Sequence, residues 1–319
     1  AGNDAVVDAS GMSAAQLSAV EGSVTKINGS GLTNLTLTSS QSEAEITALL
    51  GDNSVANTSV SVNASGMSAA KLVDVSDGIA KIAANGITGA IALDADDGVI
   101  VNAVIGNILG KASTDATVDV AATGALAAEL TTLSTNIAKV DSITGLTVTN
   151  TQSTAEIGNL LGKATGALVT ATTMDAADLA AVADNAAKIS TDGVTGTVAV
   201  TSALSAAQID ALLGKTATGA TGNVDAAGFS AAQLSAVEDN IAKVDDIDNL
   251  SITSSQTAAE ITALLGKAAG NDATVDASGM SAAQITAVNG AKATIAAGGI
   301  TNLTLTSSQT AAEITALLG

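Results

Sequence analysis

Several chemically important residue types are missing from this chain of 319 residues. It has no cysteine, histidine, tryptophan, tyrosine, proline or arginine, and its one aromatic residue is Phe229. Without His and Cys, the Ser–His and Cys–His nucleophile systems of hydrolases cannot be built. Paired carboxylates can cleave sugars, but sugar-cleaving enzymes usually stack their substrates on aromatic rings. We therefore predict that the protein is not an enzyme and that it has no catalytic residues.

Positive charge is also scarce. Eleven lysines stand against 31 Asp and Glu residues, which gives a net charge of −20 and a pI of about 4.1. Nucleic-acid binding needs a surface of Lys and Arg that releases counterions, so no nucleic-acid partner is expected. The chain lacks the apolar run of about 18 residues that a membrane span requires, so no membrane insertion is expected. The absence of cysteine excludes disulfides and thiolate metal sites.

One short segment recurs along the chain. TSSQTAAEITALLG occurs at 253–266 and again, unchanged, at 306–319, and the close copy TSSQSEAEITALLG occurs at 38–51. Repeats at a fixed spacing of about 50 residues are typical of solenoids and arrays. The sequence therefore predicts a single repeat array over 1–319. The six repeats of about 52 residues are predicted at 1–51, 52–110, 111–162, 163–214, 215–266 and 267–319.

Each repeat contains two similar halves, and each half begins with alternating residues. Alternation of apolar and polar side chains is typical of a strand with one buried face. Leu250 and Ile252 are expected to point inward, and Ser251 is expected to point outward. The other inward pairs are Leu35 and Leu37, Leu146 and Val148, Val198 and Val200, and Leu303 and Leu305, and the first halves have Val7, Val62, Val224 and Val275 beside an outward Asp8, Asn63, Asp225 or Asp276.

A helix is expected to follow each strand. Leu234, Val237, Ile241 and Val244 follow the spacing of one helical face. Eight of the twelve halves have the pattern S/T-x-x-E/Q, in which the hydroxyl and the acidic or amide side chain satisfy free backbone N–H groups reciprocally. Four examples of the pattern are Ser230 with Gln233, Ser281 with Gln284, Ser42 with Glu45, and Thr257 with Glu260. The second repeat lacks the pattern over 94–110, where we expect a bulged loop.

Glycines and lysines stand near the expected helix ends. Left-handed C-caps favour glycine, and we expect that conformation at Gly51, Gly110, Gly162, Gly214, Gly266 and Gly319. Cations near a helix C-terminus oppose the negative end of the dipole, which gives ten of the eleven lysines a structural role. Only Lys71 has no place in this scheme.

The second halves have the pattern L-x-x-L-x-L-x-x-S, as at Leu32, Leu35, Leu37 and Ser40, and at Ile300, Leu303, Leu305 and Ser308. This resembles the leucine-rich repeat, with Ser where Asn or Cys usually stands. The resemblance implies parallel strands on one face, helices on the other and an apolar layer between them. The predicted fold is an α/β solenoid of six repeats, each made of two strand–turn–helix units.

A second resemblance concerns the amino-acid composition and the recurring short segments. The LTLTSSQTAAE-like segments, the alanine-rich acidic composition and the missing cysteines are similar to the repeat regions of giant bacterial cell-surface and adhesin-type proteins. This resemblance implies an extracellular or cell-surface location and a calcium-rich medium.

Metal binding is the site question that the residues leave open. Oxygen ligands suit Ca²⁺ or Mg²⁺. Two acidic clusters are weak Ca²⁺ candidates, and the alternative for both is a solvated acidic loop. They are Asp94, Asp96 and Asp97, and Asp245, Asp246 and Asp248 beside Glu238 and Asp239.

The function that these observations favour is structural: a stalk, filament or surface layer of a bacterium. One alternative is an adhesin-type module that binds glycan or calcium through an exposed Thr/Asp sheet face, and another is a viral fibre or decoration protein. The chain begins at Ala1 and has no capping repeat at either end. We therefore expect either continuation in a longer chain or end-to-end self-association.

Overall fold

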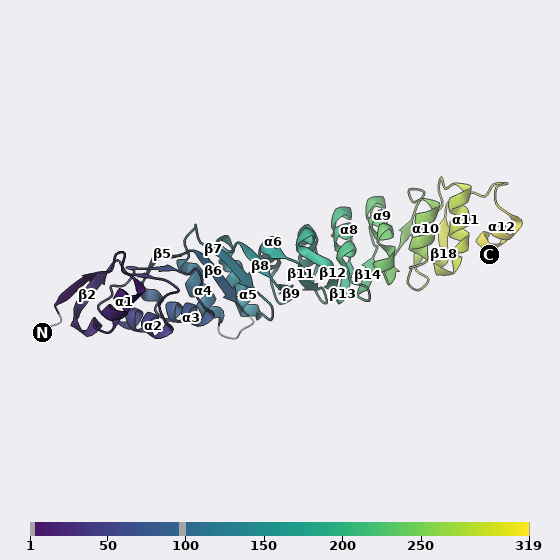
Figure 1. Ribbon diagram of the computed structural model, residues 1–319. Coiled ribbons are helices and arrows are strands. Elements are labelled where there is room, and N and C mark those ends of the chain that lie inside the picture. Colours follow the sequence, from purple (N-terminus) through teal and green to yellow (C-terminus); the bar gives the residue numbers. More distant parts are fainter. Residues whose placement is uncertain (1–3, 96–99, 319) are drawn as a thin grey trace. The chain divides into compact units, whose positions relative to one another are not determined.

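The computed structural model describes residues 4–95 and 100–318. The chain forms two compact units, and each is described by itself. The first unit comprises Ala1–Thr147 and Asn159–Ala167, and the second comprises Val148–Gly158 and Leu168–Gly319. Within each unit, strands alternate with helices along the chain (Figure 1). We call each strand–turn–helix segment a coil.

Twelve α-helices form among the described residues, and consecutive helices pack side by side within each unit (Figure 1). They are α1 (Ala14–Glu21), α2 (Glu43–Gly51), α3 (Ala69–Asp77), α4 (Asn102–Lys111), α5 (Ala127–Thr135), α6 (Thr154–Lys163), α7 (Ala176–Asp184), α8 (Ala206–Lys215), α9 (Ala231–Asp239), α10 (Ala258–Leu265), α11 (Ala282–Gly290) and α12 (Ala311–Leu318).

A short 3₁₀ helix follows each odd-numbered α-helix. The 3₁₀ helices are η1 (Val24–Lys26), η2 (Ile79–Lys81), η3 (Ile137–Lys139), η4 (Ala186–Lys188), η5 (Ile241–Lys243) and η6 (Lys292–Thr294). Our prediction of a single helical face from Leu234 to Val244 is therefore wrong. Helix α9 ends at Asp239, and Asn240 turns the chain into η5, with its Nδ2 donating to the carbonyl of Ala236 at 3.0 Å.

The strands are short, and every pairing given for them is parallel. They are β1 (Ala5–Asp8), β2 (Ile27–Thr33), β3 (Thr36–Leu37), β4 (Val60–Asn63), β5 (Ile82–Thr88), β6 (Ala90–Asp94), β7 (Thr117–Ala121), β8 (Ser142–Thr144), β9 (Thr147–Val148), β10 (Ala164–Thr165), β11 (Ala167–Thr170), β12 (Ile189–Thr195), β13 (Thr197–Val200), β14 (Thr221–Asp225), β15 (Asp246–Asp248), β16 (Ser251–Ile252), β17 (Ala273–Asp276) and β18 (Ile295–Thr301).

Strands of successive coils lie next to one another in each sheet. The first unit has the orders β1-β2, β3-β4-β5 and β6-β7-β8-β10. The second unit has β13-β14-β15 and β16-β17-β18, and most residues of the sheet β9-β11-β12 also belong to it. The register keeps equivalent residues opposite one another, as in Val224 opposite Ile247. The chain therefore has an α/β repeat fold of the solenoid type, whereas the count of six repeats in a single array stays a prediction.

The predicted alternation is confirmed in the interior coils. Leu250 and Ile252 are buried, and Ser251 between them is exposed. The last coil differs, because Leu303 and Leu305 are only half-buried and the residues around them form no strand. In the described structure, a neighbouring coil covers that coil on one side only.

The helix starts also match the prediction. At α10, the Thr257 N–H donates to Glu260 Oε2 at 2.7 Å, and the Glu260 N–H donates to Thr257 Oγ1 at 3.2 Å. The same reciprocal pair forms at Ser42, Ser230 and Ser281. Helix α4 of the irregular second repeat has no side-chain cap, as expected. Residues 96–99 of the predicted bulged loop lie outside the described part of the chain.

Our prediction of a left-handed conformation at the helix-end glycines is wrong. Helices α4, α6 and α8 continue through the glycine to the following lysine, and the chain then leaves directly in an extended conformation, as at Ala112 with φ −61° and ψ 136°. No left-handed residue is needed at such an exit. The glycines concerned are Gly51, Gly110, Gly162, Gly214 and Gly266, of which none has a positive φ, while Gly319 lies outside the described residues.

Six of the lysines cap helices, but those of the preceding coil. Lys243 Nζ donates to the carbonyl of Thr216, the C-cap residue of α8, at 2.7 Å. Lys215 Nζ donates to that of Ile189, the C-cap residue of η4, at 2.9 Å. The other contacts of this kind join Lys81 to Asp52, Lys111 to Ile82, Lys139 to Ala112 and Lys267 to Val244. We call these six contacts the lysine ladder.

Lys71 occupies a different position. It stands at the third residue of α3, where α1, α9 and α11 have Gln, and its Nζ donates to the Ser39 carbonyl of the preceding coil at 2.7 Å. Gln284 makes the same type of contact, because its Nε2 donates to the Ser254 carbonyl at 3.1 Å. The lysine that had no predicted role therefore also joins two coils.

The lysine ladder leads to a stability prediction. Lys215→Met keeps the length of the aliphatic side chain but leaves the Ile189 carbonyl without its charged donor. We expect the free energy of unfolding to fall by about 1.5–3 kcal/mol, the range for hydrogen bonds to charged groups, in urea titrations followed by circular dichroism. Lys26→Met is the control, because Lys26 is exposed and donates no such bond among the described residues. Equal losses of unfolding free energy in the two variants would contradict a stabilising role for the lysine ladder.

Candidate functional site

The first acidic cluster can be placed only in part. Asp94 ends β6 and stands opposite Ala121 of β7. Asp96 and Asp97 lie outside the described residues. The structure therefore does not decide whether these three side chains come together.

The residues of the second acidic cluster lie in different environments. Asp245 Oδ2 accepts a hydrogen bond from the Gly222 N–H at 2.9 Å, so this carboxylate joins neighbouring coils, as Asp141 does with the Val118 N–H at 2.7 Å. Asp246 and Asp248 lie two residues apart in β15. Asp246 Oδ1 is buried without a hydrogen-bond partner. Over residues 4–95 and 100–318, no three acidic side chains are grouped as a metal site would require, and calcium binding stays a prediction.

A row of Asp–Asn contacts, which we call the rungs, links neighbouring coils just after the strands end. Asn249 follows β15 and donates from Nδ2 to Asp225 Oδ1 of β14 at 2.9 Å. The asparagine has φ +54°, a left-handed conformation that Asn tolerates better than most residues. The equivalent rungs join Asn34 to Asp8 at 3.0 Å and Asn302 to Asp276 at 2.9 Å.

Other coils replace the rung with glycine. Gly145 has φ +63°, and a Cβ on it would overlap Thr123 Oγ1 of the neighbouring coil. The same arrangement holds at Gly89 beside Ser65 and at Gly196 beside Thr172. Each of these six equivalent left-handed positions therefore has either an asparagine bonded to an aspartate, or a glycine beside a hydroxyl group.

The rung aspartates are stabilised in their ionised form. The hydrogen bond from Asn249 lowers the pKa of Asp225 below its usual value, and the Ala227 N–H adds to the effect. The pKa values of Asp8 and Asp276 are lowered for the same reasons, by Asn34 and Ser10 and by Asn302 and Ser278. Each carboxylate is thus more acidic in the folded chain than in the unfolded chain.

This difference predicts the direction of the acid response. A carboxyl group with a lowered pKa stabilises the fold above its unfolded pKa of about 3.9, and the contribution is lost as pH falls through the folded pKa. We expect the melting temperature of the chain to fall between pH 5 and pH 2, and to fall less for Asp225→Asn. Asp239→Asn is the control, because it removes the same charge at an exposed helix end. Identical acid responses in the two variants would contradict the prediction.

Sequence reasoning missed a set of buried glutamines. Gln256 is buried, and its Oε1 accepts from the Thr253 N–H at 2.9 Å and from the Thr253 hydroxyl at 3.3 Å. These bonds close the turn between β16 and α10. The equivalent glutamines are Gln41, Gln152 and Gln309. The signal was the recurring T-x-x-Q, which the adjacent capping pattern obscured.

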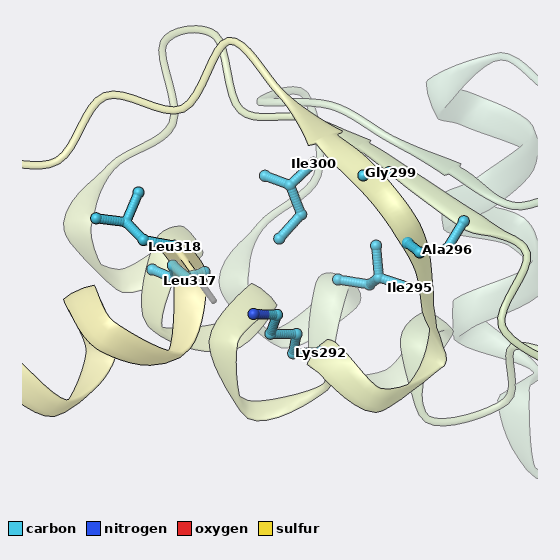
Figure 2. A pocket seen from close by; sticks show the side chains of 9 residues that line it. Lys292, Ile295, Ala296, Gly299, Ile300, Leu317 and Leu318 are labelled. Atoms are coloured by element: carbon cyan, nitrogen blue, oxygen red, sulfur yellow. The ribbon is translucent and has the colours of Figure 1, made fainter.

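One pocket lies between β18 and the last helix and has a volume of about 440 Å³. Figure 2 shows Leu317 and Leu318 on one side and Ile295, Ala296 and Ile300 on the other. Lys292 also lines it and donates to the Ala316 carbonyl.

The place equivalent to this pocket is filled in earlier coils. Ile247, the counterpart of Ile300, bridges to Ala268, and Val194 bridges to Thr216. Residues after the next helix therefore cover this position. Leu318 is 70% exposed, whereas its counterpart Leu265 is fully buried at 0%. The pocket is thus the open side of the last described coil.

The comparisons with known proteins give only a distant similarity. No family model matches the chain, and no curated protein matches it. Among solved structures, the chain is similar to the leucine-rich repeat-containing protein LegL7 from Legionella pneumophila, at 12% identity and a TM-score of 0.24, over 84% of this chain and 93% of that one. This similarity is distant. The class of the protein, an α/β repeat protein with parallel strands, rests on its own helices and strand pairings.

In the part of the chain that the structure describes, no helix is long and apolar enough to cross a membrane.

Proposed function

We propose that the chain is a structural repeat module of an extracellular or cell-surface bacterial protein. It would build a stalk, filament or surface layer by end-to-end packing of its coils. The observation that supports this proposal is the recurrence of the same bonds between neighbouring coils. The lysine ladder repeats the same donor and acceptor types from coil to coil, as in Lys215 to Ile189 followed by Lys243 to Thr216, and the rungs recur at three junctions.

Such recurrence suits a load-bearing or spacing role. In a repeat protein each unit contacts only its neighbours, so stability adds up from units and interfaces, and length can change without a new fold. Several short-range bonds between each pair of coils also hold the strands in register. The working surface of such a module is the whole succession of coils.

The charge distribution also supports it. Lysines of the ladder are directed at backbone carbonyls, and among the described residues Lys243 also forms an ion pair with Asp192 at 2.8 Å. The carboxylates therefore dominate the outer surface of a chain whose net charge is −20. Charge of one sign keeps neighbouring molecules apart along their sides. Lateral clumping is thus disfavoured.

Antibody labelling of intact cells tests the proposed location. An antibody raised against residues 163–214 should label unpermeabilised cells of the source organism, and labelling only after permeabilisation would overturn the proposal.

Deletion of 163–214 in the producing strain tests the structural role. We expect a shorter surface structure that still assembles, whereas unchanged dimensions would contradict the role.

The alternative is an adhesin-type binding module, and the outward strand residues favour it. Thr36, Thr147 and Ser251 are exposed on the strands, and so are Asp8 and Asp225. Hydroxyl and carboxylate oxygens suit glycan contacts and Ca²⁺. Thermal melting with millimolar Ca²⁺ or with a chelator distinguishes the two functions. Equal melting temperatures would favour the structural module, and a chelator-sensitive transition would favour the adhesin.

A further inference from the structure

We infer that the open side of the last coil, residues 303–318, binds the first coil, residues 4–20, of a second copy of this chain. The inference rests on the proposed structural function and names its partner and its contacts. The chain itself provides the template, because nearly the same two segments already pack against each other at an internal junction.

The internal junction joins the coil of β16 and α10 to the coil of β17 and α11. Residues 306–318 are identical to 253–265 of its first member. Residues 4–20 differ from 272–288 of its second member only at Val6, Leu17 and Ser18. The second copy would therefore present almost the same surface to the last coil that α11 and β17 present to α10 and β16.

The strand contacts transfer directly. Ser251 and Ile252 of β16 pair with Thr274 and Val275 of β17, and the Thr274 N–H donates to the Leu250 carbonyl at 2.8 Å. The corresponding contacts place Leu305 opposite Val7 of the second copy and let the Val6 N–H donate to Leu303. Val7 is half-buried, whereas its counterpart Val275 is buried.

The helix contacts transfer as well. At the internal junction, Gln284 Nε2 donates to the carbonyls of Ser254, at 3.1 Å, and Gln256, at 2.5 Å. Its counterpart Gln16 is exposed and uses only Oε1 among the described residues, for the cap at Ser13. In the second copy, the Gln16 amide would reach the carbonyls of Ser307 and Gln309.

Apolar burial supplies the driving force. Helices α10 and α11 pack side by side, and Leu264 and Leu265 are fully buried there. Leu318 is 70% exposed, and Ile314 is half-buried, although their counterparts Leu265 and Ile261 are at 0%. Covering these side chains with α1 of a second copy removes apolar surface from water.

The interface is heterologous, so it can propagate. One surface of each copy meets a different surface of the next, and repeated use of such a contact gives an open filament or a closed ring. The prediction is a series of species at multiples of 30.5 kDa that grows with concentration.

Two variants remove one surface each. Leu318→Asp places a charge on the exposed leucine of the last coil. Gln16→Glu retains a capping-box acceptor, as Glu45 provides in α2, but replaces the amide donor with an acceptor that faces carbonyls. Leu126→Asp is the matched control, because Leu126 is 68% exposed and lies outside both surfaces.

Sedimentation velocity of the 319-residue chain, at concentrations up to about 1 mM, where weak association is still measurable, tests the inference. We expect the wild type and Leu126→Asp to form the concentration-dependent series, and each end variant alone to stay at 30.5 kDa. An equimolar mixture of Leu318→Asp and Gln16→Glu keeps one intact pair of surfaces and should stop at the dimer. Circular dichroism should show the wild-type fold for all variants.

A wild type that stays at 30.5 kDa throughout would overturn the inference, as would end variants that assemble like the wild type. A mixture that grows beyond the dimer would overturn it too. A monomeric wild type with positive surface labelling of cells would remove this interface and leave the proposed function standing, so the two failures are distinguishable.

Discussion

Replacement of Leu250 with alanine is expected to lower the free energy of unfolding by about 2–5 kcal/mol, the range for large-to-small changes in a packed core. Leu250 is fully buried and precedes β16, and its carbonyl accepts the Thr274 N–H of the next coil at 2.8 Å. The substitution leaves a cavity between two coils whose strands are only a few residues long. Little else can rearrange to fill it.

Leu303→Ala is the matched control. Leu303 occupies the same place in an almost identical segment, but it is only half-buried. Its removal takes less apolar surface out of the core, and we expect the loss to be about half of that at Leu250 or less. Urea titrations followed by circular dichroism give both values. Similar losses at the two positions would contradict the assignment of Leu250 to a core shared by successive coils.

Leu250→Asp is expected to be more severe. An unpaired charge buried in an apolar site costs far more than a cavity, so the coils on both sides of Leu250 should lose order. Hydrogen exchange of the β16 and β17 amides should rise, while amides of the first unit stay protected, because repeat proteins transmit stability mainly to neighbours. A variant with unchanged melting and unchanged exchange would show that this strand assignment is wrong.

Local physical rules account for the parts of the fold that the sequence predicted well. The alternation at Leu250 and Ile252 and the capping pair at Thr257 and Glu260 depend on residues close in sequence, and both are present in the structure. The break between α9 and η5 was missed because Ile241 and Val244 continue the apolar spacing of a helix while lying in a 3₁₀ turn and an extended residue.

Contacts between coils were harder to predict. The sequence indicates that Lys243 stands near a helix end, but its actual partner is the Thr216 carbonyl, 27 residues earlier. The rungs were hidden for the same reason, since Asp225 and Asn249 become neighbours only when two coils stack in register. Comparison of the repeats along the sequence reveals them, because Asp at the strand end accompanies Asn in the next coil, as in Asp8 with Asn34 and Asp276 with Asn302.

The candidate calcium residues show a related limit. Proximity in sequence grouped Asp245, Asp246 and Asp248, but successive residues of an extended chain point to opposite faces, so Asp245 lies apart from Asp246 and Asp248. Asp245 is engaged with the Gly222 N–H, and only Asp246 and Asp248 remain two residues apart in β15. Calcium binding by these residues stays a prediction.

Gly145→Ala is expected to lower the free energy of unfolding by about 1–3 kcal/mol, the cost of holding a non-glycine residue in an unfavourable backbone conformation. Gly145 has φ +63°, and the added Cβ would overlap Thr123 Oγ1. Gly110→Ala is the control with the opposite sign. Gly110 lies in α4 with nothing within 4 Å of an added Cβ, so alanine should raise stability by about 0.5–1 kcal/mol.

The rung arrangement predicts how Gly145 can be replaced without loss. Residues 225–227 and Asn249 form a rung with the sequence Asp-Ala-Ala, whereas the equivalent residues here are Ala-Ala-Thr at 121–123 with Gly145. The triple variant Ala121→Asp, Thr123→Ala and Gly145→Asn installs the Asp–Asn rung in this coil. Asn tolerates the left-handed conformation, removal of the hydroxyl makes room, and the new carboxylate accepts the amide. We expect urea unfolding to return close to the wild-type value. The single variant Gly145→Asn is the comparison. A triple variant that is as unstable as this single variant would show that an Asp–Asn rung cannot replace the glycine beside a hydroxyl group.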